Sequence, residues 1–130
     1  MTEPVLQVKN LQTHFLLHDV TVKAVDGLSF NVAPSETLAI VGESGCGKSV
    51  TALSVMRLVP EPPGRIVGGS IQFEGEDLLK VPARRLPSIR GSRIAMVFQD
   101  PMTSLNPVFT IGAQIAESVN AHLNLSRKQS

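Results

Sequence analysis

The sequence of 130 residues contains five phenylalanines but neither tryptophan nor tyrosine, so few stacking platforms for bases are available. A single cysteine, Cys46, excludes an intrachain disulfide. An excess of one charge is also lacking, because the formal net charge is +1 and lysine and arginine form no long run. This balance gives no electrostatic support for nucleic-acid binding, and we predict no nucleic-acid partner.

Long hydrophobic runs are lacking too. Uninterrupted apolar runs such as residues 38–41 and 94–98 are far shorter than the roughly 20 residues of a membrane-spanning helix. The first residues lack a basic region leading into an apolar stretch, so no signal peptide is predicted. With 42% hydrophobic and 18% charged residues, the composition is that of a globular domain able to bury a core. Any work at a membrane would therefore proceed through a partner.

Alternation of apolar and polar residues predicts the first strands, because side chains alternate between the two faces of a sheet. The segments predicted in this way are residues 5–15, 21–32 and 68–73, with a turn at residues 16–19. The pair Asp26-Gly27 inside the second of these strands is typical of a bulge or a bend.

Two further segments, residues 37–41 and 94–99, are short continuous apolar runs, which favour strands buried on both faces. One helix is predicted to begin near Lys48. Another is predicted to run from an N-cap at Thr110 to about Leu123. Strands buried on both faces, together with helices, indicate an α/β fold.

Residues 42–49 read Gly-Glu-Ser-Gly-Cys-Gly-Lys-Ser and match the pattern G-x-x-x-x-G-K-[ST]. Backbone N–H groups of such a loop surround phosphates, and the following helix directs its positive end at them. Lys48 would place its charge between the β- and γ-phosphates, and Ser49 would offer its hydroxyl to Mg²⁺. The residues predicted to bind the nucleotide here are Gly42, Glu43, Ser44, Gly45, Cys46, Gly47, Lys48, Ser49 and Val50. The motif alone does not choose among ATPases, GTPases and small-molecule kinases.

Three further features make the chain resemble the ATP-binding cassette (ABC) family. They are Phe15 upstream of the loop, Gln99 in a segment (residues 97–101) that resembles the family's glutamine loop, and the stretch at residues 101–107 followed by residues 110–112. The resemblance implies that Phe15 stacks on adenine. It also implies that Gln99 reaches Mg²⁺ and the attacking water, so that Gln99 and Lys48 are the catalytic candidates. The alternatives are a core phenylalanine and a glutamine that only hydrogen-bonds at a strand end.

The stretch at residues 101–107, together with residues 24–30 and 42–57, resembles the oligopeptide, dipeptide and nickel importer branch of that family. The resemblance implies a P-loop NTPase fold of the ABC type with an N-terminal antiparallel β subdomain, over residues 5–130. The implied activity is ATP hydrolysis with Mg²⁺ that energises a peptide-type importer.

The resemblance also implies partners and a location. The expected partners are membrane permease subunits, a second ATPase subunit in a homo- or heterodimer and, indirectly, an extracytoplasmic substrate-binding protein. The expected location is peripheral, at the cytoplasmic face of the cell membrane. Two alternatives stay open: a soluble cassette protein that acts on DNA or ribosomes, and an ATP-binding remnant that does not hydrolyse.

Some features depart from the family pattern. Ser35 stands where glycine is usual and would be strained if the turn requires a positive φ. Cys46 stands where serine is commoner, which predicts thiol-sensitive nucleotide binding. No segment after Gln99 resembles the catalytic carboxylates, switch histidine or signature of a complete cassette ATPase. We therefore expect a partial domain, ending after the glutamine loop and the start of the helical subdomain, that hydrolyses ATP very slowly alone.

Overall fold

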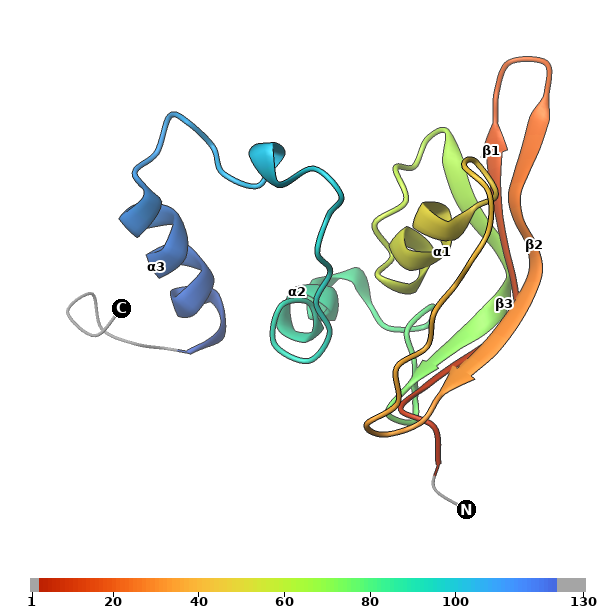
Figure 1. The fold of residues 1–130 in the computed structure, drawn as a ribbon, viewed down its shortest axis with the longest axis horizontal. Coiled ribbons are helices and arrows are strands. Elements are labelled where there is room, and N and C mark those ends of the chain that lie inside the picture. Colours follow the sequence, from red (N-terminus) through yellow and green to blue (C-terminus); the bar gives the residue numbers. More distant parts are fainter. Residues whose placement is uncertain (1–2, 124–130) are drawn as a thin grey trace. The chain divides into compact units, whose positions relative to one another are not determined.

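The computed structural model describes residues 3–123, and the chain divides into two compact units, Met1–Val81 and Pro82–Ser130. The first unit contains a sheet and one helix, coloured red to green in Figure 1. The second contains short helices, loops and one longer helix. The domain predicted over residues 5–130 thus ends outside the described residues.

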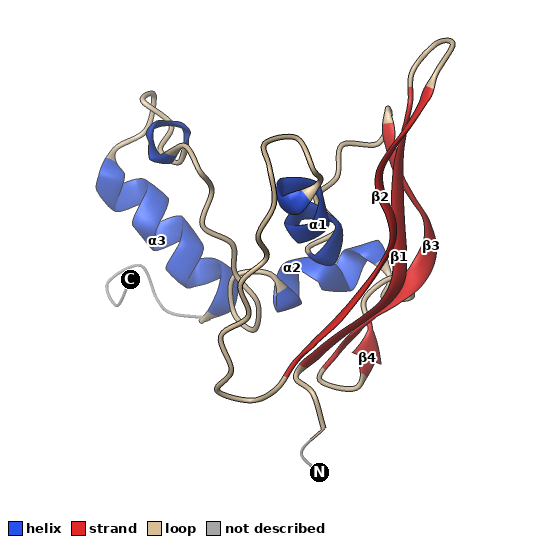
Figure 2. Cartoon of the chain, turned by 45° about the vertical axis from the view of Figure 1, so that its right-hand side comes forward, coloured by secondary structure: helices blue, strands red, loops and turns tan. Residues whose placement is uncertain are grey.

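The first unit is built on a four-stranded antiparallel sheet with the strand order β2-β1-β3-β4 (Figure 2). The strands are β1 (Leu6–Leu16), β2 (Thr21–Val32), β3 (Gly64–Phe73) and β4 (Glu76–Asp77). The first three confirm the predicted strands, although β3 begins before residue 68. The predicted turn is confirmed as well, because Leu17 and Val20 exchange backbone hydrogen bonds of 2.9 and 3.3 Å.

The bulge predicted at Asp26-Gly27 is confirmed. The pairing of β1 with β2 skips Gly27, which has a φ of 86°, and then skips Ala24. Each skip reverses which side chains face the core. Val25, between the two irregularities, is therefore the buried residue of this stretch.

Helix α1 (Lys48–Val55) lies against β1 and β2 and begins where the sequence predicts (Figures 1 and 2). The side chains of the sheet, of α1 and of the segment after β4 form the core of this unit. Its buried apolar residues are Val8, Leu11, Val25, Val55, Met56, Ile71, Phe73, Leu78 and Val81. After α1, Arg57 donates from Nη1 to the carbonyls of Leu78 at 3.1 Å and Val81 at 2.6 Å. These bonds tie the end of the helix to the end of the unit.

The prediction of a strand at residues 37–41 is wrong. This segment is irregular and exposed, with 93% of Val41 accessible to solvent. A strand buried on both faces needs hydrogen-bonding neighbours, and no strand among residues 3–123 pairs with it. The turn before it meets the expectation of strain, because Ser35 follows Pro34 with a φ of 61°.

The second unit contains η1 (Ala83–Arg85), α2 (Leu86–Ile89), η2 (Pro101–Thr103) and α3 (Ile111–His122). The predicted N-cap of α3 is confirmed, because Thr110 Oγ1 accepts a hydrogen bond of 3.2 Å from Ala113 N. None of the residues of α3 is buried. Among the described residues, no helix has the length and apolarity needed to cross a bilayer.

The strand predicted for residues 94–99 is also wrong. Ile94 forms an isolated bridge with Arg90, and residues 95–98 are irregular. Val97 is 96% exposed. The physical reason is the same as for residues 37–41. An apolar run does not form a strand unless a neighbouring strand satisfies its backbone hydrogen bonds.

Candidate phosphate-binding site

The loop before α1 owes its path to glycines. The backbone N–H of Cys46 donates to the carbonyl of Glu43 at 3.3 Å and closes a tight turn. Gly45 within this turn has a φ of 82°, and Gly47, the N-cap of α1, has a φ of 94°. Residues with a side chain are strained at such angles, so glycine is the favoured residue at both places.

Close packing gives two of the glycines a second function. A Cβ at Gly47 would collide with the carbonyl oxygen of Ala24, the residue that the β1–β2 pairing skips. A Cβ at Gly42 would collide with Cys46 Sγ, whereas one at Gly45 would meet open space. Gly47 therefore lets the start of α1 touch the sheet, and Gly42 lets the Cys46 side chain fold over the loop.

The Lys48 ammonium lies over the same loop. Its Nζ donates to the carbonyls of Gly42 and Glu43, both at 2.6 Å, and to Cys46 Sγ at 3.4 Å. N–H groups in the first turn of a helix have no intrahelical partners, and the helix dipole is positive there. Lys48 and the N-terminus of α1 therefore concentrate positive potential at residues 42–49, which fits a phosphate group.

A magnesium ion fits this place without a cluster of acidic side chains. Ser49 lies exposed in the first turn of α1, so its hydroxyl is open to a ligand. Within residues 3–123, no three histidine, cysteine, aspartate or glutamate side chains gather as metal ligands. Mg²⁺ bound with phosphates keeps several waters and takes only one or two protein ligands. One hydroxyl beside the loop satisfies that requirement.

Phe15 lies near the end of β1, opposite Val22 on β2 and Gly64 on β3. Its ring is half-buried, and Cε1 would be 3.0 Å from a Cβ at Gly64. The ring edge thus rests where Gly64 has no side chain. This position agrees both with a stacking ring and with a core phenylalanine, so the contact with adenine stays a prediction.

Gln99 lies in the second unit, at an exposed bend. Its expected place at the end of a buried strand is wrong, because residues 94–98 form no strand in the described chain. The predicted role of Gln99 toward Mg²⁺ and water stays a prediction. Next to it, Asp100 Oδ1 accepts a hydrogen bond from Met102 N, and Thr103 Oγ1 donates to the Asp100 carbonyl, both at 3.0 Å.

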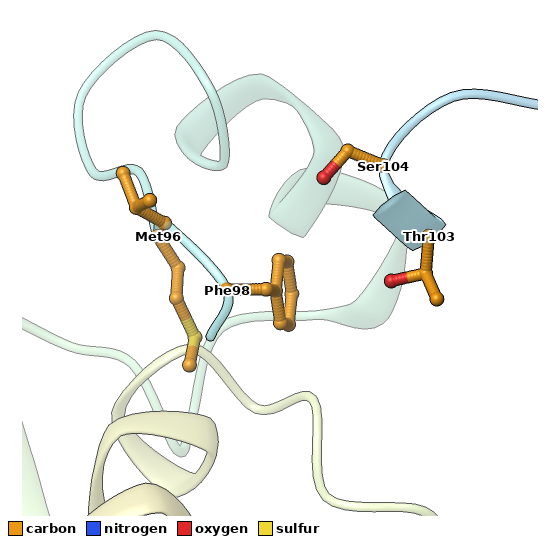
Figure 3. A pocket seen from close by; sticks show the side chains of 5 residues that line it. Met96, Phe98, Thr103 and Ser104 are labelled. Carbon is orange, nitrogen blue, oxygen red and sulfur yellow. The ribbon is translucent and has the colours of Figure 1, made fainter. Parts of the chain in front are cut away.

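A pocket of about 620 Å³ lies in the same unit, and three of its lining residues directly precede Gln99 in the sequence. It is lined by Met96, Val97, Phe98, Thr103 and Ser104. Figure 3 shows the Phe98 ring between the Met96 side chain and the turn that carries Thr103 and Ser104. Apolar and hydroxyl side chains therefore meet around the predicted glutamine loop.

Gln114 is a residue whose function the sequence pattern did not reveal. Its Oε1 accepts from Asn106 N at 2.8 Å, and its Nε2 donates to the carbonyls of Asn106 and Phe109 at 2.9 and 3.0 Å. Asn106 Oδ1 accepts in turn from Val108 N at 3.0 Å. The Asn-Pro stretch is thus fastened to the first turns of α3. The signal was an amide side chain one turn after the Thr110 N-cap.

A glycine-rich loop with this sequence, between a sheet and a helix that begins with Lys-Ser, is typical of proteins that bind nucleotide phosphates. The model of the ABC transporter family matches residues 25–129, and the chain belongs to this family. The resemblance drawn from the sequence is thereby confirmed. Membership implies nucleotide binding.

The chain is similar to ATP-binding proteins of peptide transporters. It is 52% identical over 95% of its length to the "Probable peptide ABC transporter ATP-binding protein y4tR" of Sinorhizobium fredii. It is 48% identical over 95% to the oligopeptide transport ATP-binding protein AppD of Bacillus subtilis, and 47% identical over 97% to the dipeptide transport ATP-binding protein DppD of that organism. The chain spans 37% of the first of these relatives and 38% of the other two.

Proposed function

We infer that this chain binds MgATP, with the triphosphate held by residues 42–50 and the adenine stacked on Phe15. The observation that carries this inference is the Lys48 ammonium, which two carbonyls hold over a loop at the positive end of α1. Backbone N–H groups of the loop would bind phosphate oxygens. The Ser49 hydroxyl would be one ligand of Mg²⁺, and Gln99 a second.

We infer further that the whole protein is the ATP-binding and ATP-hydrolysing subunit of a peptide-type importer. Support comes from relatives that are 47–52% identical and are named as peptide, oligopeptide or dipeptide transport ATP-binding proteins. Its partners would be membrane permease subunits at the cytoplasmic face, a second ATPase subunit and, indirectly, an extracytoplasmic substrate-binding protein. ATP hydrolysis would supply the free energy for the transport cycle.

The domain boundaries belong to the same inference. Residues 5–130 would be the phosphate-binding half of an ABC nucleotide-binding domain. These residues alone would hydrolyse ATP very slowly, because no segment after Gln99 resembles the carboxylates and signature that complete such a site. Turnover by the isolated 130 residues at the rate of an intact cassette ATPase would contradict this.

Nucleotide binding is tested by titration with a fluorescent ATP analogue, with and without Mg²⁺, followed by competition with unlabelled ATP and GTP. We expect saturable binding that Mg²⁺ strengthens and from which both unlabelled nucleotides displace the probe, because stacking on an aromatic ring does not distinguish adenine from guanine. Absence of binding at millimolar nucleotide would contradict the proposed site. Unchanged ATP affinity in Phe15→Ala would contradict the role of Phe15.

The transport role is tested by purification of the tagged protein from gently solubilised membranes. Permease subunits in the eluate are the expected result. Copurification of ribosomes or DNA without permease would favour the soluble alternative. The non-hydrolysing remnant differs in showing no turnover even when a partner ATPase subunit is supplied.

A further inference from the structure

A fully buried hydrogen bond joins the sheet to helix α1. Thr13 Oγ1 on β1 and Ser54 Oγ on α1 are 2.7 Å apart, and both residues are 0% exposed. Ser54 also donates its hydroxyl proton to the carbonyl of Val50 at 2.7 Å. A serine has only one such proton, so Thr13 must be the donor to Ser54. The result is a chain of two hydrogen bonds from the strand through the helix side chain to the helix backbone.

Thr13 and Ser54 belong to the two elements, β1 and α1, that carry the two halves of the proposed nucleotide site. Thr13 precedes Phe15 by two residues, and side chains at this spacing share a face of a strand. Ser54 follows Lys48 by six residues on α1, which is about 9 Å along the helix axis. The bond therefore links the strand that carries the predicted adenine platform to the helix that carries the phosphate loop.

A second contact fixes the other end of the same helix face. Gly47, Thr51 and Ser54 follow one another at helical spacing, and Thr51 is 3% exposed. At Gly47 the helix already abuts the carbonyl of Ala24. Two points of contact, at Gly47 and at Ser54, define how α1 lies on the sheet. The neighbouring apolar contacts of α1 tolerate sliding, whereas a hydrogen bond has a narrow range of distance and angle.

We propose that Thr13 and Ser54 are positioning residues that set the placement of Phe15 relative to the phosphate loop. The inference rests on the proposed function, because it assumes that one ligand spans both places. A nucleoside triphosphate touches Phe15 and the loop together, whereas inorganic tripolyphosphate touches the loop alone. Loss of the bond should therefore weaken the first ligand and spare the second.

The test uses calorimetry on the full-length protein. It measures the affinity for MgATP and the affinity for magnesium tripolyphosphate. Thr13→Val keeps the shape of the side chain and removes the hydroxyl. We expect its MgATP affinity to fall about three- to tenfold, the range of one neutral hydrogen bond, with tripolyphosphate affinity unchanged. Ser54→Ala removes the other hydroxyl and gives the same test if Thr13→Val does not fold.

Controls separate positioning from general destabilisation. Thr13→Ser retains the donor and should restore the ratio of the two affinities. Thr21→Val makes the same substitution at an exposed position of β2 and should leave the ratio unchanged. Partial unfolding lowers both affinities by the same factor, so the ratio does not respond to it.

The outcomes distinguish this inference from the proposed function. The inference is supported if the ratio of MgATP affinity to tripolyphosphate affinity falls in Thr13→Val and recovers in Thr13→Ser. Wild-type protein that binds MgATP more tightly than tripolyphosphate, with the same ratio in both valine and alanine variants, overturns the inference alone. Wild-type protein that binds neither ligand overturns the proposed function and this inference with it.

Discussion

Two apolar segments of the first unit have opposite environments. In β1, Val8 and Leu11 are 0% exposed, whereas Val41 in residues 37–41 is 93% exposed. The difference is pairing, because β1 lies between β2 and β3, and no strand of residues 3–123 pairs with residues 37–41. Hydrophobicity therefore sets the preference of a segment for burial, and hydrogen-bonding neighbours decide whether it becomes a strand.

The two longer helices show the same contrast. Helix α1 is short, but Thr51, Ser54 and Val55 are buried against its unit. Helix α3 is longer, and none of its residues is buried. Its order comes from the Thr110 cap and the Gln114 bonds, which are local. Tertiary packing stabilises α1, and local hydrogen bonds stabilise α3.

The largest expected effect tests this contrast through stability. Leu11→Ala removes a fully buried side chain and should lower the free energy of unfolding by about 3–5 kcal/mol. Ile115→Ala on α3, where the side chain is 57% exposed, should change it by less than about 0.5 kcal/mol. Denaturant titration measures both, and equal effects would break the comparison.

The next effect sharpens the comparison at the site. Lys48→Ala removes the ammonium that lies over the loop and should weaken MgATP binding about 10- to 100-fold. Lys9→Ala, at an exposed position of β1, is the matched control and should bind like the wild type. Titration with a fluorescent ATP analogue compares them. Unchanged affinity in Lys48→Ala would remove the loop from the proposed function.

A smaller effect examines the locally stabilised helix. Thr110→Ala loses the N-cap and should destabilise α3 by about 1 kcal/mol. Faster amide hydrogen exchange confined to residues 111–122 is the expected readout. Thr110→Ser keeps the capping oxygen and should protect those amides like the wild type. Exchange that accelerates equally in β1 would show that α3 is not local in its stability.

The smallest effect concerns Cys46. Its exposed thiol lies at the phosphate loop with Sγ 3.4 Å from Lys48 Nζ, so bound MgATP should slow its labelling by a maleimide. Cys46→Ser should abolish labelling, because Cys46 is the single cysteine, and leave ATP affinity close to that of the wild type. Equal labelling rates with and without MgATP would contradict this.

Local signals were sufficient to predict much of the fold. Alternation predicted β1 and β2, Asp26-Gly27 predicted the bulge, and Thr110 predicted a helix start, because each feature depends on residues close in sequence. The two continuous apolar runs were misread as strands. A continuous apolar run indicates a preference for burial, but it does not indicate whether a neighbouring strand is present.

Some residues of the site were predictable from local sequence, and others were not. The loop glycines and Lys48 form a motif of adjacent residues, so the sequence was enough to propose them. Thr13 and Ser54 are 41 positions apart, and the bond between them is visible only once α1 lies on the sheet. The relation of Gln99 to the loop depends on two units, and it stays a prediction.

The contact between Gly47 and the Ala24 carbonyl has an evolutionary consequence. A lineage that lost its nucleotide would still be constrained to glycine at position 47, because any side chain there meets the sheet backbone. Gly45 faces open space, so a side chain there would meet only the strain of its φ of 82°, which asparagine and aspartate tolerate better than other residues. Drift would therefore appear first at position 45. Glycine retained at position 47 would therefore not by itself show that a descendant still binds nucleotide.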